Sequence, residues 1–179
     1  MFQKVLVANR GEIALRVIRA CKELGIATVA IYSEADRNAL HVSFADEAIC
    51  VGPAAARDSY LHIPNVISAA DVTGADAIHP GYGFLAENID FAKAVRAHDM
   101  EFIGPSAEHL LTFGDKLSAK AAARAAGVPL LPGSPDSLSN VEEAVRLARG
   151  VGYPMLLKAA FGGGGKGMRI VRDEAELRD

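Results

Sequence analysis

Residues 4–32 read KVLVANRGEIALRVIRACKELGIATVAIY, and this stretch decides the fold class. The run at 4–9 is short, apolar and rich in β-branched residues, which predicts a strand buried on both faces. After a turn at Arg10 and Gly11, a helix is predicted to about residue 24, where Gly25 ends it. Its predicted apolar stripe consists of Ile13, Val17, Ala20, Cys21 and Leu24. A second apolar strand is predicted at 27–32, so the stretch forms a βαβ unit and implies a parallel sheet.

The same alternation continues along the chain. Strands are predicted at 47–51, 75–79 and 101–104, with helices at 63–71 and 88–98 between them. This order predicts an α/β fold with a doubly wound parallel sheet of the Rossmann-like kind. The pattern of predicted helices and strands changes near residues 112–116.

Beyond that change the predicted elements are fewer. Helices are expected at 115–126 and 141–151, strands at 154–160 and 168–171, and the start of another helix at 173–178. One hairpin with so little around it is too small to bury its own faces. The second domain is therefore expected to be incomplete in this chain.

Composition narrows the functional classes. The 179 residues carry a formal net charge of −3, which offers no basic surface for nucleic acid and no polybasic membrane anchor. The sequence contains no apolar run of about 20 residues and no signal peptide, so a cytoplasmic location without a membrane span is expected. The two cysteines, Cys21 and Cys50, lie among apolar neighbours and are predicted to be reduced core thiols.

A glycine-rich segment follows the strand that ends near Lys158. It contains Gly162, Gly163, Gly164, Gly165, Lys166 and Gly167. Consecutive glycines expose backbone N–H groups without a Cβ, so such a loop is able to fold over phosphates, with Lys158 and Lys166 supplying positive charge. The alternative is a flexible hairpin loop with solvated lysines. A strand is predicted after the loop, whereas a Walker loop would precede a helix.

Two further segments lie at the ends of predicted strands. The first strand–helix turn, ANRGEIA at 8–14, has one glycine where a dinucleotide fold has GxGxxG, so NAD binding is not expected and the turn reads as structural. HPGYGFLAEN at 79–88 follows a predicted strand, where ligands gather, and groups His79, Tyr82, Glu87 and Asn88. Turn formation by His79 and helix capping by Glu87 and Asn88 are equally open interpretations. Taken alone, Lys116 reads as a solvent-facing lysine.

Together these segments resemble the biotin carboxylase family, which includes the biotin carboxylase subunits and domains of acetyl-CoA, propionyl-CoA and pyruvate carboxylases. The matching segments are KVLVANRGEIALRVIRACKELGI at 4–26, HPGYGFLAEN at 79–88, GDK at 114–116 and KAAFGGGGKGM at 158–168. The glycine loop alone would indicate only the broader ATP-grasp superfamily. The alternatives are another ATP-grasp ligase, similar to carbamoyl-phosphate synthetase or a purine-pathway carboxylase, and a non-catalytic assembly or nucleotide-binding module.

The resemblance implies a pre-ATP-grasp domain over 1–114 and the start of an ATP-grasp domain over 115–179. It implies that Lys116 and Lys158 contact ATP, that Gly162–Gly167 (with Lys166) cover its phosphates, and that Tyr82 and Gly83 line a biotin pocket. Arg19 and Glu23, which fall with Arg16 on the polar face of the first helix, match positions of a dimer contact.

The resemblance also implies the reaction: carboxylation of carrier-bound biotin by bicarbonate and ATP through carboxyphosphate, with Mg2+ bridging the phosphates. A biotin carboxyl carrier protein and a carboxyltransferase would be partners, and the intact protein a homodimer. The metal-binding carboxylates, the bicarbonate-binding basic residues, the general base and the hinge that contacts adenine are expected beyond Asp179. Neither catalytic residues nor metal ligands are therefore expected within the chain, and the 179 residues alone are expected to be inactive.

Overall fold

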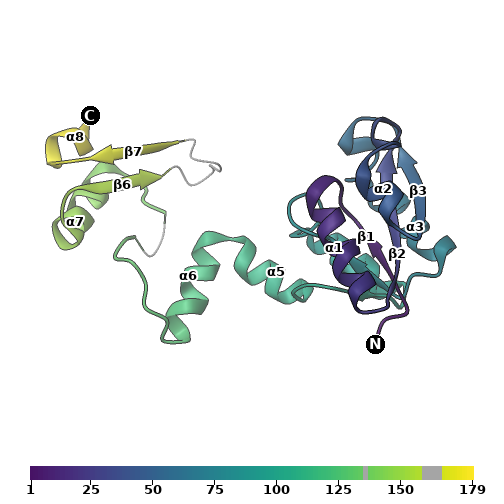
Figure 1. Cartoon of the computed structure of the whole chain (residues 1–179). Helices are drawn as coiled ribbons and strands as arrows, with labels where there is room; N and C mark the ends of the chain where they lie inside the picture. Colours follow the sequence, from purple (N-terminus) through teal and green to yellow (C-terminus); the bar gives the residue numbers. More distant parts are fainter. Residues whose placement is uncertain (135–136, 159–166) are drawn as a thin grey trace. The chain divides into compact units, whose positions relative to one another are not determined.

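The computed structural model describes residues 1–134, 137–158 and 167–179. The chain divides into two compact units, Met1–Gly114 and Asp115–Asp179 (Figure 1). In the described residues no helix has the length and apolar character that crossing a membrane requires.

The first unit is built on a five-stranded parallel sheet. Its strands are β1 (Lys4–Val7), β2 (Ala27–Ser33), β3 (Glu47–Gly52), β4 (Ala77–His79) and β5 (Glu101–Phe102). Their order is β3-β2-β1-β4-β5, and every pair is parallel. The chain therefore builds outward from β1 in one direction and then returns to add β4 on its other side. This confirms the predicted doubly wound α/β class and makes the carboxyl ends of β1 and β4 the topological switch point, where such folds hold ligands.

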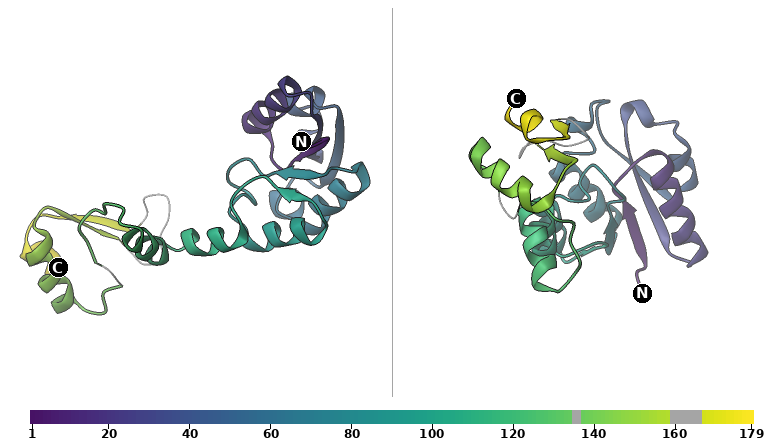
Figure 2. Two further views of the ribbon diagram at one scale, coloured as in Figure 1. Left: turned by 90° about the horizontal axis from the view of Figure 1, so that it is seen from below. Right: turned by 90° about the vertical axis from the view of Figure 1, so that its left-hand side faces the viewer.

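Helices lie on both faces of this sheet, as the views in Figures 1 and 2 show. They are α1 (Gly11–Glu23), α2 (Leu40–Phe44), α3 (Ile63–Thr73), α4 (Ile89–Ala97) and α5 (Ala107–Gly114), with short 3-10 turns η1 (Glu34–Asp36) and η2 (Ala56–Asp58). In β1, Val5 and Val7 pack with α1, whereas Leu6 packs on the opposite face with α3 and α4. Alternation along each strand thus feeds two cores, which is why the strands read as continuous apolar runs.

Parts of the sequence interpretation of α1 were wrong. Its buried residues are Ala14, Val17, Ile18 and Cys21. Ala20 and Leu24, placed on the apolar stripe from spacing, are exposed, and Leu24 stands beyond the last helical residue as the C-cap. The apolar arc is therefore rotated toward Ala14 and Ile18, because α1 packs on the sheet and also contacts α2.

The prediction for Cys50 was also wrong, because this cysteine is exposed while Cys21 is buried. Strand β3 is at the edge of the sheet, and its alternate residues Ile49 and Val51 take the places against the core. Strands β4 and β5 are shorter than predicted, and the short helices α2 and α5 had not been predicted.

The second unit contains three helices and a hairpin. They are α6 (Lys116–Ala125), α7 (Val141–Val151), β6 (Met155–Lys158), β7 (Met168–Val171) and α8 (Glu174–Arg178). Each helix is preceded by a capping residue whose side-chain oxygen accepts the backbone N–H of the residue three positions later. The capping residues are Asp115, Asn140 and Asp173. Strands β6 and β7 are antiparallel, and one small core of Val145, Ala148, Val171 and Leu177 joins the hairpin to α7 and α8. The predicted helices and hairpin are confirmed over the described residues.

Candidate functional site

The side chain of Asn9, two residues beyond the end of β1, lies at the switch point of the first unit and is only 4% exposed. Its amide nitrogen donates to the carbonyl oxygens of Pro80 and Tyr82, each at 2.8 Å. Its oxygen accepts the backbone N–H of Arg10 at 2.9 Å. A buried amide with these partners fastens the 79–84 segment to the turn between β1 and α1, because leaving such a group unpaired would cost free energy.

Arg10 fastens the same two segments through its charge and its flat guanidinium. The guanidinium lies 5.5 Å from the centroid of the Tyr60 ring and 5.6 Å from that of Phe84, and these two rings stack at 5.2 Å. It also donates to Asp36 at 3.1 Å. Phe84, with φ of 39°, is thereby held in a backbone conformation that side-chain-bearing residues seldom adopt.

Asp36 is the acceptor at the centre of this group. It receives hydrogen bonds from Tyr60 at 2.6 Å, from Ser33 at 3.0 Å and from Arg10. Partial burial alone would raise its pKa, but these hydrogen bonds outweigh burial and lower the pKa of Asp36 below its usual 3.8. Burial, together with the bond to Asp36, raises the pKa of Tyr60 to about 12. The Asp36 carboxylate therefore stays ionised at neutral pH and remains paired with Arg10 and Tyr60.

Tyr82 projects from the switch point with 61% of its surface exposed. Its backbone is tied to Asn9, and its hydroxyl donates to a carboxylate oxygen of Glu12 in the first turn of α1. Gly81 and Gly83 flank it with φ of 66° and 65°. A Cβ on Gly81 would stand 2.8 Å from the Asn9 side-chain nitrogen, so this position requires glycine for its conformation and for its close approach to the turn.

The remaining polar residues of the 79–88 segment have structural partners. His79 Nδ1 accepts the backbone N–H of Gly81 at 3.0 Å, and burial lowers the pKa of this histidine. Asn88 caps α4 by accepting the N–H of Phe91 at 2.9 Å. Turn formation and capping, left open from the sequence, therefore describe His79 and Asn88.

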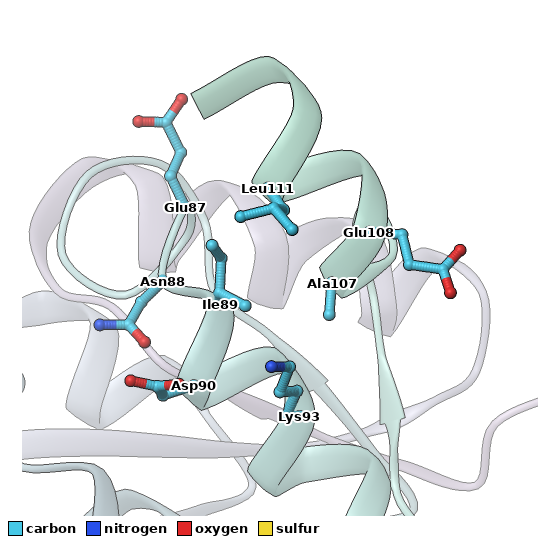
Figure 3. A pocket seen from close by; sticks show the side chains of 8 residues that line it. All are labelled: Glu87, Asn88, Ile89, Asp90, Lys93, Ala107, Glu108 and Leu111. Atoms are coloured by element: carbon cyan, nitrogen blue, oxygen red, sulfur yellow. The ribbon is translucent and has the colours of Figure 1, made fainter. Parts of the chain in front are cut away.

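Glu87 and Asn88 also line a hollow of about 560 Å³ against α5 (Figure 3). Ile89 and Leu111 form its apolar part, Asp90 and Lys93 are charged lining residues, and the carboxylates of Glu87 and Glu108 point outward from its rim. The 79–88 segment therefore contributes to two different parts of the surface. Tyr82 contacts the β1–α1 turn, and Glu87 lines the hollow beside α5.

The second unit carries the predicted nucleotide-contacting lysines. Lys116 is the first residue of α6 and Lys158 is the last of β6, and both are exposed. Gly162, Gly163, Gly164, Gly165 and Lys166 lie outside the described residues. Gly167, just before β7, is exposed with φ of 72°.

Within the part of the chain that the structure describes, one face of the β6–β7 hairpin is exposed, a feature that the sequence interpretation missed. Register pairs Leu156 with Ile170 and Lys158 with Met168, so these four residues share a face. Leu156, Met168 and Ile170 are 47%, 46% and 58% exposed, while the opposite face packs against α7 and α8. The available signal was the period-two alternation of MLLK and MRIV, which marks two distinct faces. An apolar surface with a lysine at its end is suited to bind a flat heteroaromatic ring that carries a negatively charged chain.

The other predicted positions are surface residues. Arg19 and Glu23 are exposed on α1, as predicted for its polar face. Among the described residues, no group of three or more His, Cys, Asp or Glu is arranged to hold a metal ion.

Comparison with known proteins identifies the family. A family model described as the biotin carboxylase N-terminal domain matches residues 1–110. The chain belongs to this family. A second model, the ATP-binding domain of the carbamoyl-phosphate synthase L chain, matches residues 115–179. The resemblance drawn from the 4–26 and 79–88 segments is confirmed.

The relatives are biotin carboxylases and larger carboxylase chains. Over 178 residues the chain is 61% identical to the biotin carboxylase of Pseudomonas aeruginosa, covering 99% of this chain and 40% of that protein. It is 53% identical to the human mitochondrial propionyl-CoA carboxylase alpha chain, covering 99% of this chain and 24% of that protein. The chain therefore spans about 40% of the length of the biotin carboxylases that it matches.

Solved structures agree with the family. A Campylobacter jejuni biotin carboxylase in complex with β,γ-ATP matches with a TM-score of 0.90 at 49% identity, over 99% of this chain and 40% of that one. The biotin carboxylase domain dimer of Hydrogenobacter thermophilus 2-oxoglutarate carboxylase, in complex with MgADP, ADP and bicarbonate, matches with a TM-score of 0.86 at 55% identity. That match covers 99% of this chain and 39% of the other.

Proposed function

We propose that this chain is the N-terminal part of an ATP-dependent biotin carboxylase, a ligase that carboxylates carrier-bound biotin with bicarbonate through carboxyphosphate. The observation that carries the proposal is the interlock of the two family segments, in which Asn9 of the β1–α1 turn holds the carbonyl oxygens of Pro80 and Tyr82. Family membership over residues 1–110 supports it. In this proposal Met1–Gly114 is the pre-ATP-grasp domain and Asp115–Asp179 the start of the ATP-grasp domain.

The nucleotide is proposed to bind in the second unit. The uncovered face formed by Leu156, Met168 and Ile170 would receive the adenine, and Lys158 at its end would neutralise phosphate oxygens. Lys116 and the glycines at 162–167 with Lys166 complete the proposed ATP site. The complexes of the two structural relatives with nucleotides support this assignment.

Phosphoryl transfer in such an enzyme depends on positioning and charge neutralisation, which explains why lysines and glycine N–H groups suffice without a nucleophile. Mg2+ would accompany the nucleotide, as it does in the MgADP complex of the relative.

Biotin is proposed to bind beside Tyr82 and Gly83. The phenol ring is exposed, and the bond from Asn9 fixes its backbone at the switch point, so the ring is placed to form one wall for the ureido ring. Proposed partners are bicarbonate, a biotin carboxyl carrier protein or domain and a carboxyltransferase. Arg19 and Glu23 would contribute to a homodimer contact. A cytoplasmic enzyme of this kind would serve fatty acid biosynthesis where the carboxyl acceptor is acetyl-CoA.

A hybrid enzyme tests the proposal, with these 179 residues replacing the matching segment of the Pseudomonas aeruginosa biotin carboxylase. We expect ADP release by the hybrid to require bicarbonate and to increase when free biotin is added, and the 179 residues alone to give no turnover. Lys158→Ala should raise the KM for ATP about tenfold or more, because a charge-assisted contact is lost. Lys120→Ala, an exposed lysine of α6, is the matched control and should leave that KM unchanged. ADP release that ignores biotin would contradict the proposal.

A further inference from the structure

Tyr82 is held at two points by a single turn. At its backbone, the buried Asn9 amide donates to the Tyr82 carbonyl oxygen at 2.8 Å. At the tip of its side chain, the hydroxyl donates to Glu12. Both partners come from the β1–α1 connection, more than 65 residues away along the chain.

The two contacts differ in what they fix. The Asn9 bond fixes the backbone of the loop, and the close fit of Gly81 against Asn9 and Ile13 leaves that backbone little room to move. The Asn9 bond and the fit of Gly81 do not determine the rotamer of the Tyr82 ring, which is 61% exposed. Without a further contact, this ring would exchange among staggered rotamers. The bond to Glu12 ties the far end of the ring, and a hydrogen bond to a carboxylate is among the stronger ones.

Glu12 is well suited to this task. It is in the first turn of α1, where the positive end of the helix dipole favours a carboxylate. Its backbone belongs to a helix packed on the sheet through Ala14 and Val17, so the acceptor starts from a fixed base. Arg10 of the same turn holds Phe84, two residues beyond Tyr82, against Tyr60.

We propose that Glu12 is a positioning residue that sets the ring orientation of Tyr82, and that the β1–α1 turn as a whole holds this ring against the biotin site. The inference rests on the proposed function, because the site is the biotin pocket assigned to Tyr82 and Gly83 above. It adds a role for a segment read from sequence as a structural connection alone. With its hydroxyl donated to Glu12, Tyr82 presents its ring to the substrate and leaves proton transfer to other groups.

The first test needs only the 179-residue chain and is independent of activity. The bond to Glu12, followed by burial and the Glu12 charge, raises the pKa of Tyr82 above 10.0. Glu12→Gln keeps an acceptor oxygen but removes the charge, so the pKa of Tyr82 should fall toward 10.0 in an ultraviolet titration of the tyrosines. Tyr82→Phe identifies its signal among the four tyrosines. An unchanged Tyr82 titration in Glu12→Gln would overturn the clamp.

The second test uses the hybrid enzyme. Glu12→Ala should raise the KM for free biotin about fivefold, with the KM for ATP unchanged, and Glu12→Gln should restore most of the loss. In a Tyr82→Phe background, Glu12→Ala should have no further effect, since the two residues act through one bond. Equal losses in both backgrounds would refute the inference. Glu34→Ala, an exposed glutamate of η1, is the control.

The two proposals fail in different ways. If the unmodified hybrid shows no biotin-dependent ADP release while Glu12→Gln still lowers the pKa of Tyr82, the contact is real and the proposed function is wrong. If the hybrid turns over with biotin and the double-mutant cycle is additive, the function stands and the positioning role of Glu12 is wrong.

Discussion

At the scale of single residues, the candidate biotin site depends on how closely two segments approach. Gly81 and Gly83 have nearly the same left-handed φ but different surroundings. A Cβ on Gly81 would meet Asn9 at 2.8 Å and Ile13 at 3.1 Å, whereas a Cβ on Gly83 would meet nothing within 4 Å. Substitutions at these two glycines therefore separate two free-energy costs. One is the cost of a left-handed backbone conformation, and the other is the cost of a steric clash with Asn9.

We expect Gly83→Ala to lower the free energy of unfolding by roughly 1 kcal/mol, the cost of a left-handed non-glycine residue. Gly81→Ala should lower it by about 1–3 kcal/mol more, because the Asn9 amide must move from its two acceptors. Urea denaturation followed by circular dichroism measures both. Equal losses in the two variants would show that the loop relaxes away from Asn9 without cost.

At the scale of elements, the β6–β7 hairpin has one structural face and one free face. Val171 is fully buried against α7 and α8, and its neighbour Ile170 is 58% exposed on the other side. Adjacent residues of one strand thus have different tasks: Val171 stabilises the unit, and Ile170 belongs to the proposed adenine surface.

Val171→Ala should destabilise the second unit by roughly 2 kcal/mol, since it leaves a cavity in a core of four buried residues. Ile170→Ala should change stability by less than about 0.5 kcal/mol. Thermal unfolding of the chain reports the first effect. In the hybrid, Ile170→Ala should instead raise the KM for ATP, and a large loss of stability in this variant would place Ile170 in the core.

At the scale of the whole molecule, the two units differ greatly in the apolar core that each contains. Met1–Gly114 buries two clusters, one on each face of its sheet, whereas the described residues of Asp115–Asp179 bury four hydrophobic residues in one cluster. Burial of apolar area is the main source of folding free energy, so the first unit contains what independent stability requires.

Residues 1–114 expressed alone should therefore unfold in one cooperative transition, while residues 115–179 alone should be marginal. Circular dichroism melting curves of the two pieces and dispersion of their amide NMR signals test this. A non-cooperative melt for residues 1–114 would mean that its two cores need the second unit.

Much of the fold of this protein can be predicted from local sequence patterns. The apolar run at 4–9, the helical stripe and the second strand predicted the parallel doubly wound sheet, because periodicity and short connections are properties of neighbouring residues. The segments at 4–26 and 79–88 predicted the family through their resemblance to its motifs. Local patterns failed at Cys50 and Leu24, where burial depends on strand order and on the packing partner of α1.

The amino-acid order by itself determined the fold class, most of the longer helices and strands, and the family. Only the tertiary structure decided that Asn9 and Glu12 hold Tyr82, that Arg10 holds Phe84, and that one face of the β6–β7 hairpin is left uncovered. The physical reason is range. The bonds from Asn9 and Tyr82 join residues 70 to 73 positions apart, and such contacts exist only once β1 and β4 lie side by side.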